Sequence, residues 1–311
     1  MSRLHTARPA EEVIRTDDRT DAWPLACPVC DAGLCRTKTS LVCSVGHSFD
    51  VAKEGYVNLM PSAHRSRGID GDTQEMVQAR RRFLEVGHYR QLLERLETDV
   101  AELLRDSAGA RRDPQCRACV LEVGCGEGHY LGNLARSRGA VAEPNAVFMG
   151  ADVSKPAVRL AARHFPEATF FVADVNRRIY VRDASVRILL DVFAPRNPVE
   201  FDRIVEPGGA ALIVIPSPTH LHSLRTDLGL LGVQDDKEAK VLQRLGAGFS
   251  LVDRSELSYP IELQSDAMRD LVNMGPNRWH APDLSAGRGS ASLMTEASFV
   301  ILQLRRHDEA R

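Results

Sequence analysis

The chain has 311 residues, of which 43% are hydrophobic and 26% are charged. This balance is ordinary for a folded globular protein and excludes a mostly disordered, fibrous or membrane protein. The 40 basic and 42 acidic side chains leave a net charge of −2, which excludes a polycation that binds nucleic acid through bulk charge alone. Nucleic-acid binding would therefore require a local basic surface.

The seven cysteines are odd in number and clustered in sequence, and the chain is long enough to fold without a disulfide framework. The polar N-terminus lacks the apolar segment of a signal peptide, and no apolar run is long enough to cross a membrane. We therefore expect a cytoplasmic protein with reduced thiols and no membrane contact.

Changes in composition divide the chain into four parts. We expect a flexible tail over residues 1–22, a small cysteine-bearing domain over 23–60 and a helical connector over 61–110. The remaining residues, 111–311, are long enough to form one large domain.

Two helices are predicted in the connector. The first begins after Asp72 or Thr73, either of which can cap it, and carries apolar side chains as far as Leu84. The second runs from about Tyr89 to Leu104, with apolar side chains at helical spacing.

From Cys116 onward, short apolar runs alternate with helical patterns. The predicted strands are Cys119–Val123, Val147–Asp152, Thr169–Ala173, Val186–Leu190, Ala210–Ile215 and Phe299–Leu304. Strands that alternate with helices indicate βαβ units. The fold class is therefore α/β, with a mostly parallel sheet and helices on both of its faces.

Four N-terminal residues have the spacing of a zinc site: Cys27, Cys30, Cys43 and His47. Two short ligand pairs, joined by a spacer that forms a hairpin, supply the four ligands of a tetrahedral zinc ion. Four protein ligands leave no position for water, so we expect one structural zinc per chain. Free surface thiols are the alternative, and Cys35, in the spacer, is not expected to be a ligand.

A second C-x2-C pair, Cys116 and Cys119, has no partner pair downstream. Cys119 leads into a predicted strand, so we interpret these residues as linker and core cysteines, with a redox pair as the alternative.

The segment Glu122-Val-Gly124-Cys-Gly126-Glu127-Gly128 follows a predicted strand and precedes a predicted helix. Its glycines allow sharp turns and a close approach of the backbone to a ligand, and the acidic side chain suits a cationic ligand group. The segment resembles motif I of class I S-adenosylmethionine-dependent methyltransferases. The resemblance implies a seven-stranded Rossmann-like domain over 111–311.

Two acidic residues and one turn support this interpretation. Asp152 ends the second strand, where a carboxylate can accept both ribose hydroxyls. Asp174 follows the third strand, where this class commonly holds the adenine amino group, and Pro207-Gly-Gly209 resembles a turn of the fold. A Rossmann-type oxidoreductase is the alternative, because an acidic end to the second strand occurs in both classes.

Further motifs resemble the bacterial 23S rRNA (guanine-N1)-methyltransferases over nearly the whole chain. They are Phe49–Leu59, Gly87-His-Tyr89 and Met274–His280, together with the zinc spacing. The segment Asp191–Pro198 resembles the macrolide-resistance branch, whose members protect producers of tylosin or mycinamicin.

The resemblance implies methyl transfer from S-adenosylmethionine to N1 of a guanine in a hairpin loop of domain II of 23S rRNA, near the peptide exit tunnel. It also implies a homodimer with a cleft for RNA. Cofactor contacts carried over by motif are Tyr89, Gly126, Glu127 and His220; for Tyr89 and His220, packing and loop roles are the alternatives.

Guanine N1 carries a proton that must leave before the methyl group is transferred, and the base must be unpaired or flipped. Asp191 and His220 are the candidate general bases, although Asp191 could instead cap a helix or loop. Phe193 or Trp279 could stack on the target base.

Candidate RNA contacts are basic residues of the N-terminal half: Arg36, Lys38, Arg65, Arg67 and the consecutive Arg80, Arg81 and Arg82. Consecutive residues on a helix point in different directions, so the last three cannot all face one RNA. Three alternatives stay open: methylation of another RNA base, methylation of a small molecule, and a non-catalytic scaffold that only binds RNA.

Overall fold

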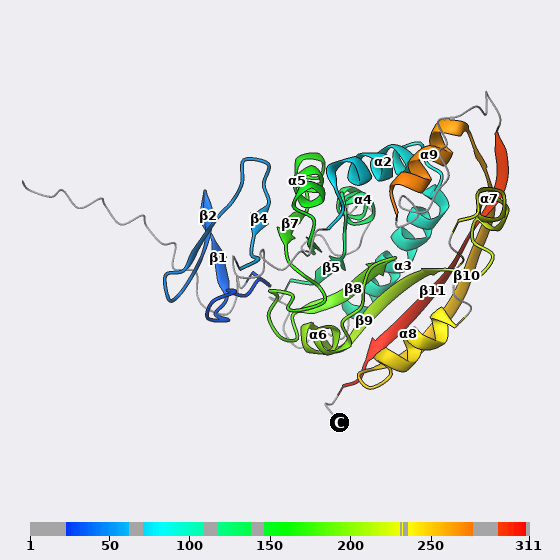
Figure 1. Ribbon diagram of the computed structural model, residues 1–311. Coiled ribbons are helices and arrows are strands. Elements are labelled where there is room, and N and C mark those ends of the chain that lie inside the picture. Colours follow the sequence, from blue (N-terminus) through cyan, green and yellow to red (C-terminus); the bar gives the residue numbers. More distant parts are fainter. Residues whose placement is uncertain are drawn as a thin grey trace, which may run out of the picture.

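The computed structural model describes residues 23–61, 71–108, 117–137, 146–230, 232, 236–275 and 292–308. Within these residues a small N-terminal sheet lies beside a large α/β unit (Figure 1). None of the helices in this part of the chain is long and apolar enough to cross a membrane.

The small sheet consists of β1 (Leu34–Arg36), β2 (Ser40–Cys43) and β3 (Ser48–Asp50). Both pairings are antiparallel. The turn between β1 and β2 is closed by Thr37, whose hydroxyl donates to the Ser40 carbonyl and accepts from the Ser40 amide at 3.0 Å. The predicted hairpin between the two ligand pairs is thus confirmed.

The large sheet has eight strands in the order β10-β11-β9-β8-β5-β6-β7-β4 among the described residues. Their bounds are β4 (Val57–Asn58), β5 (Cys119–Val123), β6 (Val147–Asp152), β7 (Thr169–Val172), β8 (Val186–Val192), β9 (Val205–Pro216), β10 (Phe249–Leu263) and β11 (Leu293–Arg306). All neighbouring pairs from β4 to β9 are parallel, whereas β11 is antiparallel to both β9 and β10. The mostly parallel sheet is therefore confirmed.

The edge strand β4 adds one strand to the seven expected from the resemblance. Val57 and Asn58 pair with Phe171 and Val172 of β7. Because β4 comes from the segment directly after the small sheet, the N-terminal module and the large unit share a sheet.

Helices lie on both faces of the sheet (Figure 1). They are α2 (Gln74–Glu85), α3 (Arg90–Ala108), α4 (His129–Ser137), α5 (Lys155–His164), α6 (Pro198–Ile204), α7 (His222–Leu228), α8 (Lys237–Leu245) and α9 (Ser265–Asn273). Thr73 caps α2, since its hydroxyl accepts from the Met76 amide at 3.4 Å.

Two hydrophobic cores fill the two sides of the sheet, because successive side chains of a strand point to opposite faces. In β5, Val120 packs in the core that also contains residues of α2, α3, α4 and α5. The next residue, Leu121, packs in the other core, with residues of α6 and α8 and with Cys27 and Cys43. The N-terminal module is thus anchored on the second face.

The order of strands fixes where a ligand can bind. From β5 the chain passes outward through β6 and β7 and then returns to β8 on the other side of β5. In open parallel sheets, ligands bind at the carboxyl ends of the strands where the order reverses. The loops after β5 and β8 meet at this point, and a Cβ on Gly124 would lie 2.5 Å from Cβ of Ala194.

Candidate active site and metal centre

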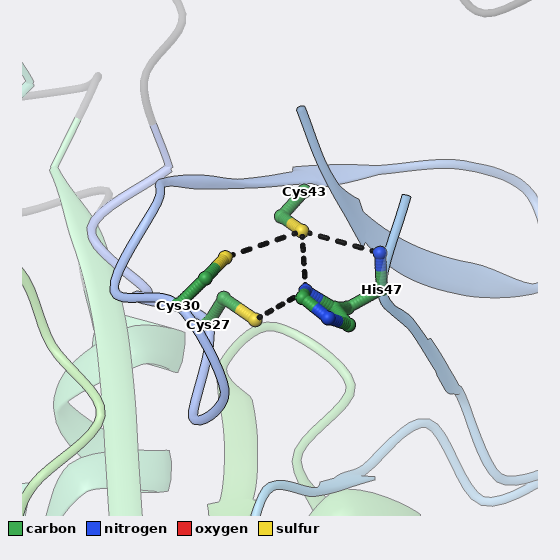
Figure 2. Close-up of side chains that lie close together, drawn as sticks. All are labelled: Cys27, Cys30, Cys43 and His47. Atoms are coloured by element: carbon green, nitrogen blue, oxygen red, sulfur yellow. Dashed lines mark hydrogen bonds between the residues drawn. The ribbon is translucent and has the colours of Figure 1, made fainter. Parts of the chain in front are cut away.

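The four predicted zinc ligands converge in the N-terminal module (Figure 2). Their ligand atoms all lie within 4.8 Å of one another. Sγ of Cys43 lies 3.3 Å from Nδ1 of His47 and 3.7 Å from Sγ of Cys30, and Sγ of Cys27 lies 3.7 Å from the same Nδ1. Cys35 is exposed and lies outside this group.

These separations fit a tetrahedral zinc ion. Zinc–sulfur bonds of about 2.3 Å and zinc–nitrogen bonds of about 2.0 Å place adjacent ligand atoms roughly 3.5 to 3.8 Å apart. Burial raises the pKa of the Cys43 thiol, but backbone N–H groups of His47 and Val45 lower it, and the net pKa is about 6. The backbone N–H groups therefore favour the thiolate form of Cys43, which is the form that binds a metal.

The loop after β5 requires its glycines. Gly124, Gly126 and Gly128 have φ angles of +65°, +54° and +82°. A Cβ on Gly128 would lie 2.9 Å from both Ala161 and Phe170, so a side chain fits neither the conformation nor the space.

Two buried carboxylates hold this loop in shape. Glu122 accepts a hydrogen bond from the Leu131 amide at 3.0 Å, which ties β5 to α4. Asp152 accepts from the amides of Gly126 at 2.9 Å and Ser154 at 2.7 Å. Burial raises the pKa of both carboxyl groups, so their hydrogen bonds do not fully offset desolvation.

Glu127 faces Arg80, a partly buried arginine that the sequence suggested as an RNA contact and not as a cofactor-site residue. The Arg80 guanidinium lies 4.0 Å from Glu127 Oε2 and 2.5 Å from Asp72 Oδ2. It also donates to the Met274 carbonyl at 2.8 Å. Burial raises the pKa of Glu127 to about 7, although Arg80 opposes this shift.

Unpartnered oxygens show that the site fits S-adenosylmethionine. Oε2 of Glu127 and Oδ2 of Asp174 are buried and accept no hydrogen bond from the residues that the structure describes, although Arg177 Nε lies 3.2 Å from the latter. Asp174 uses its other oxygen to accept from the Asn176 amide at 3.0 Å. Acceptors of this kind match the ammonium group and the adenine amine of the cofactor, both of which are donors.

Tyr89 and His220 are brought together in a buried aromatic cluster. The Tyr89 hydroxyl lies 3.1 Å from Nε2 of His220, and Nδ1 of His220 accepts from the Ser298 amide at 3.1 Å. The neutral imidazole therefore carries its proton on Nε2 and donates it to Tyr89. Burial and the positive charge of Arg225 together lower the pKa of His220 to about 3.

Asp191 lies at the carboxyl end of β8 and is 0% exposed. Its Oδ1 accepts from the Ala194 amide and from Arg196 Nη2, both at 3.2 Å. Its Oδ2 is buried and has no hydrogen-bond partner in the described part of the chain. Burial raises the pKa of Asp191 to about 7, against the opposing charges of Arg196 and Lys237.

Phe193 follows in the same loop and has a φ angle of +60°. Its side chain is 40% exposed, while its ring centroid lies 5.5 Å from that of Phe299 and 6.4 Å from that of Tyr89. The other aromatic candidate, Trp279, lies outside the described residues.

The three consecutive arginines point to three different partners. Arg80 lies in the acidic site, Arg81 pairs with Glu85, and Arg82 forms a two-pronged ion pair with Asp270 of α9. The expectation that they cannot all face one RNA is thus confirmed. Arg65 and Arg67 lie outside the described residues, whereas Arg36 and Lys38 are exposed on the zinc module.

Cys119 is a core residue, as the sequence predicted, and not a member of an exposed redox pair. It is buried in β5, its thiol lies 3.8 Å from Sδ of Met149, and burial raises its pKa to about 12. Such a thiol is unreactive. Cys116 lies outside the described residues.

A cavity of about 350 Å³ opens beside the acidic site, between α2, the start of α3, α4 and the end of α5. Its lining includes Glu127 and His129 together with three arginines, Arg81, Arg90 and Arg136. Burial lowers the pKa of His129 to about 4, so this imidazole is neutral at pH 7.

Comparisons with known proteins agree with both parts of the fold. Residues 25–67 match the family described as "RlmA, N-terminal", a zinc ribbon, and residues 120–209 match a methyltransferase domain. A 23S rRNA (guanine(748)-N(1))-methyltransferase from Streptomyces fradiae is 42% identical over 265 residues, which are 85% of this chain and 89% of that protein.

Two further relatives carry the name 23S rRNA (guanine-N(1)-)-methyltransferase. The one from Micromonospora griseorubida is 39% identical over 264 residues, 82% of this chain and 87% of that protein. The one from Bacillus subtilis (strain 168) is 29% identical over 261 residues, again 82% of this chain and 87% of that protein.

Proposed function

This chain belongs to the 23S rRNA (guanine-N1)-methyltransferases, and we propose that it methylates N1 of a guanine in a hairpin loop of domain II of 23S rRNA. The Streptomyces fradiae relative is named for guanine 748, and we propose the equivalent guanine as the target. A methyl group there, near the peptide exit tunnel, would obstruct macrolides such as tylosin or mycinamicin and confer resistance.

One observation carries this proposal on the structural side. Three buried carboxylates have an oxygen without a hydrogen-bond partner among the described residues: Glu127 in the glycine loop, Asp174 after β7 and Asp191 at the carboxyl end of β8. A cationic cofactor rich in donors, and a substrate that must lose a proton, both suit such a site.

Several residues of this chain would hold the cofactor. S-adenosylmethionine, when bound, supplies a methyl group on a positively charged sulfur. Asp152 would accept from the ribose hydroxyls and Asp174 from the adenine amine. Glu122 and Glu127 would give the site a negative potential that suits a cationic cofactor. The glycines of the loop would allow the cofactor to approach the backbone closely.

Of the two candidate bases, the hydrogen bonds favour Asp191. His220 uses Nδ1 to accept from Ser298 and carries a proton on Nε2, so it has no free lone pair. Oδ2 of Asp191 is free to take the N1 proton. The N1–CH3 bond then forms as the S–CH3 bond breaks, leaving S-adenosylhomocysteine and a protonated Asp191 that returns its proton to water.

We propose that the RNA contacts the zinc module. Arg36 and Lys38 are exposed there, and no ion pair engages them among the residues that the structure describes. Lysine and arginine side chains on one surface bind phosphates regardless of the net charge of the chain. We further propose a cytoplasmic homodimer, because ribosomal RNA is the substrate and the family resemblance implies two copies.

The proposal is tested by incubating the protein with labelled S-adenosylmethionine and 23S rRNA and mapping stops of reverse transcription, because an N1 methyl group blocks pairing. A donor-dependent stop in the domain II hairpin is expected. Transfer to another base, or to a macrolide precursor, would overturn it. Calorimetry distinguishes the scaffold alternative, which predicts RNA binding without cofactor binding.

A further inference from the structure

Arg80 of α2 places a positive charge in a site whose other charged groups are acidic. Its side chain is 25% exposed, and its guanidinium lies against the glycine loop, since a Cβ on Gly126 would lie 3.1 Å from Nη1 of Arg80. Burial lowers the pKa of Arg80, but the charges of Glu127 and Asp72 raise it by more, so the guanidinium stays charged. The methyl-transfer chemistry itself gives this cation no role.

The two terminal nitrogens of Arg80 have different surroundings. Nη2 lies 2.5 Å from Oδ2 of Asp72 and donates to the Met274 carbonyl at 2.8 Å. Nη1 lies 4.0 Å from Oε2 of Glu127, which is too far for a hydrogen bond. Within the described part of the chain, Nη1 donates to no group and this Oε2 accepts from none. A charged donor and a charged acceptor are therefore both free beside the glycine loop.

Contacts with two other parts of the fold fix the position of Arg80. The Asp72 carbonyl accepts from Oγ of Ser154, in the loop after β6, at 2.7 Å. Two turns of chain away from Asp72, Arg82 forms its two-pronged ion pair with Asp270 of α9. The guanidinium is thus held in place before a ligand arrives, and a preorganised donor loses less conformational entropy on binding.

The free donor and acceptor match the amino-acid end of S-adenosylmethionine. This cofactor carries an ammonium group and a carboxylate on the same carbon atom. Its ammonium and sulfonium groups are attracted by acidic side chains, whereas its carboxylate is repelled by Glu127 and Asp152 unless a cation faces it. The guanidinium of Arg80 is such a cation, because its charge lowers the pKa of both Glu127 and Asp152.

We propose that Arg80 binds the carboxylate of S-adenosylmethionine through Nη1, while Oε2 of Glu127 accepts from the neighbouring ammonium group. Hydrogen bonds between a guanidinium and a carboxylate are short and strong. Asp72 and the Met274 carbonyl are positioning groups, because they hold Nη2 and leave Nη1 free beside the loop. Arg80 thereby selects ligands that carry the carboxylate over adenosyl compounds that lack it.

This inference rests on the cofactor of the proposed function and not on its RNA target, so it is tested by calorimetry without RNA. The wild type is titrated with S-adenosylmethionine and with decarboxylated S-adenosylmethionine, which keeps the sulfonium and the ammonium group. We expect the first ligand to bind about 10- to 100-fold more tightly, the range for one hydrogen bond to a charged group. Equal affinities would overturn the proposal, whereas binding of neither ligand would refute the proposed function as well.

Arg80→Gln tests the assignment to this residue, and Arg81→Gln is its matched control. Arg81 is the next residue on α2, its side chain is 26% exposed, and it pairs with Glu85 outside the acidic site. We expect Arg80→Gln to lose about 10- to 100-fold in affinity for S-adenosylmethionine. The variant should bind the decarboxylated ligand at least as tightly as the wild type does, since a like charge has been removed. Arg81→Gln should keep both affinities.

The two ligands separate a direct contact from a structural role. Equal losses for both ligands in Arg80→Gln would overturn the proposal, because Arg80 would then only shape the glycine loop. An unchanged affinity for S-adenosylmethionine, or a loss of the same size in Arg81→Gln, would overturn it too. If Arg80→Gln does not fold, the comparison of the two ligands on the wild type decides alone.

Discussion

Tyr89 and His220, 131 residues apart in the chain, share a buried hydrogen bond of 3.1 Å between the phenol oxygen and Nε2. His220 also accepts from the Ser298 amide. Its orientation and its tautomer are therefore both fixed, and Tyr89 keeps its own hydroxyl proton for another acceptor. The pair couples the start of α3 to the loop after β9.

Replacement of Tyr89 by phenylalanine tests this coupling. The variant keeps the ring packing but leaves the Nε2–H of His220 buried without an acceptor, which costs about 1–3 kcal/mol of unfolding free energy. We expect a lower midpoint of urea unfolding and weaker binding of S-adenosylmethionine by calorimetry. Wild-type values for both would show that the hydrogen bond has no such role.

Activity should depend on pH through Asp191 rather than His220. A general base acts when it is deprotonated, and the pKa of Asp191 is about 7, so kcat/KM should fall as pH drops below 7. The pKa of His220 is about 3, so His220 does not titrate in this range.

The variants His220→Gln and Asp191→Asn separate the two residues. We expect His220→Gln to keep the midpoint of the pH profile even where its rate is lower, and Asp191→Asn to lose the rate at every pH. A midpoint that disappears in His220→Gln would identify the imidazole as the titrating group.

Asp191 should also make the protein less stable as pH rises from acidic values to about 7. A carboxyl group whose folded pKa is raised contributes stability that is full below its unfolded pKa and is lost as pH rises through its folded pKa. For Asp191 this window runs from its ordinary pKa of 3.8 to about 7, and the shift corresponds to roughly 4 kcal/mol.

The measurement is the unfolding free energy of wild type and Asp191→Asn from pH 5 to pH 8. The difference isolates Asp191 from Glu122 and Glu127, which titrate in both proteins. We expect the unfolding free energy of the wild type to fall relative to that of Asp191→Asn as pH rises. The advantage of the variant is reduced because Arg196 loses its ion pair with the Asp191 carboxylate. Parallel curves would contradict a raised pKa.

Much of the site could be predicted because its residues are neighbours in sequence. The glycine loop and the zinc ligands each lie within one short segment, so their spacing alone indicated their geometry. Arg80 was missed as a cofactor-site residue because Glu127 lies 47 positions later, and no local pattern connects them. The left-handed conformation of Phe193 was equally hidden, since a phenylalanine in sequence gives no sign of a strained backbone.

Elements of the fold were missed where the hydrophobic residues do not repeat with the period of a strand or a helix. The two-residue strand β4 is too short to form a pattern, yet it extends the large sheet. The strand β10 has an exposed first half rather than a continuous apolar run, because it is the edge strand beside β11. Helices α6 to α9 were likewise not assigned from the sequence.

Zinc should stabilise more than the N-terminal module. Cys27 and Cys43 pack in the same core as the large sheet, so Cys27→Ala should remove the metal, lower the melting temperature and weaken RNA binding together. Cys35→Ala is the matched control, because Cys35 is exposed and outside the ligand group. Elemental analysis should find one zinc per chain in the control. Retention of zinc and melting temperature by Cys27→Ala would contradict this ligand set.

The central claim is that this chain places a methyl group on N1 of one guanine. The most direct measurement is mass spectrometry of nuclease fragments from the domain II hairpin, after reaction with S-adenosylmethionine and wild type or Asp191→Asn. We predict 1-methylguanosine at a single position with the wild type and none with the variant. An unmodified hairpin, or a methyl group on another atom or base, would contradict the claim.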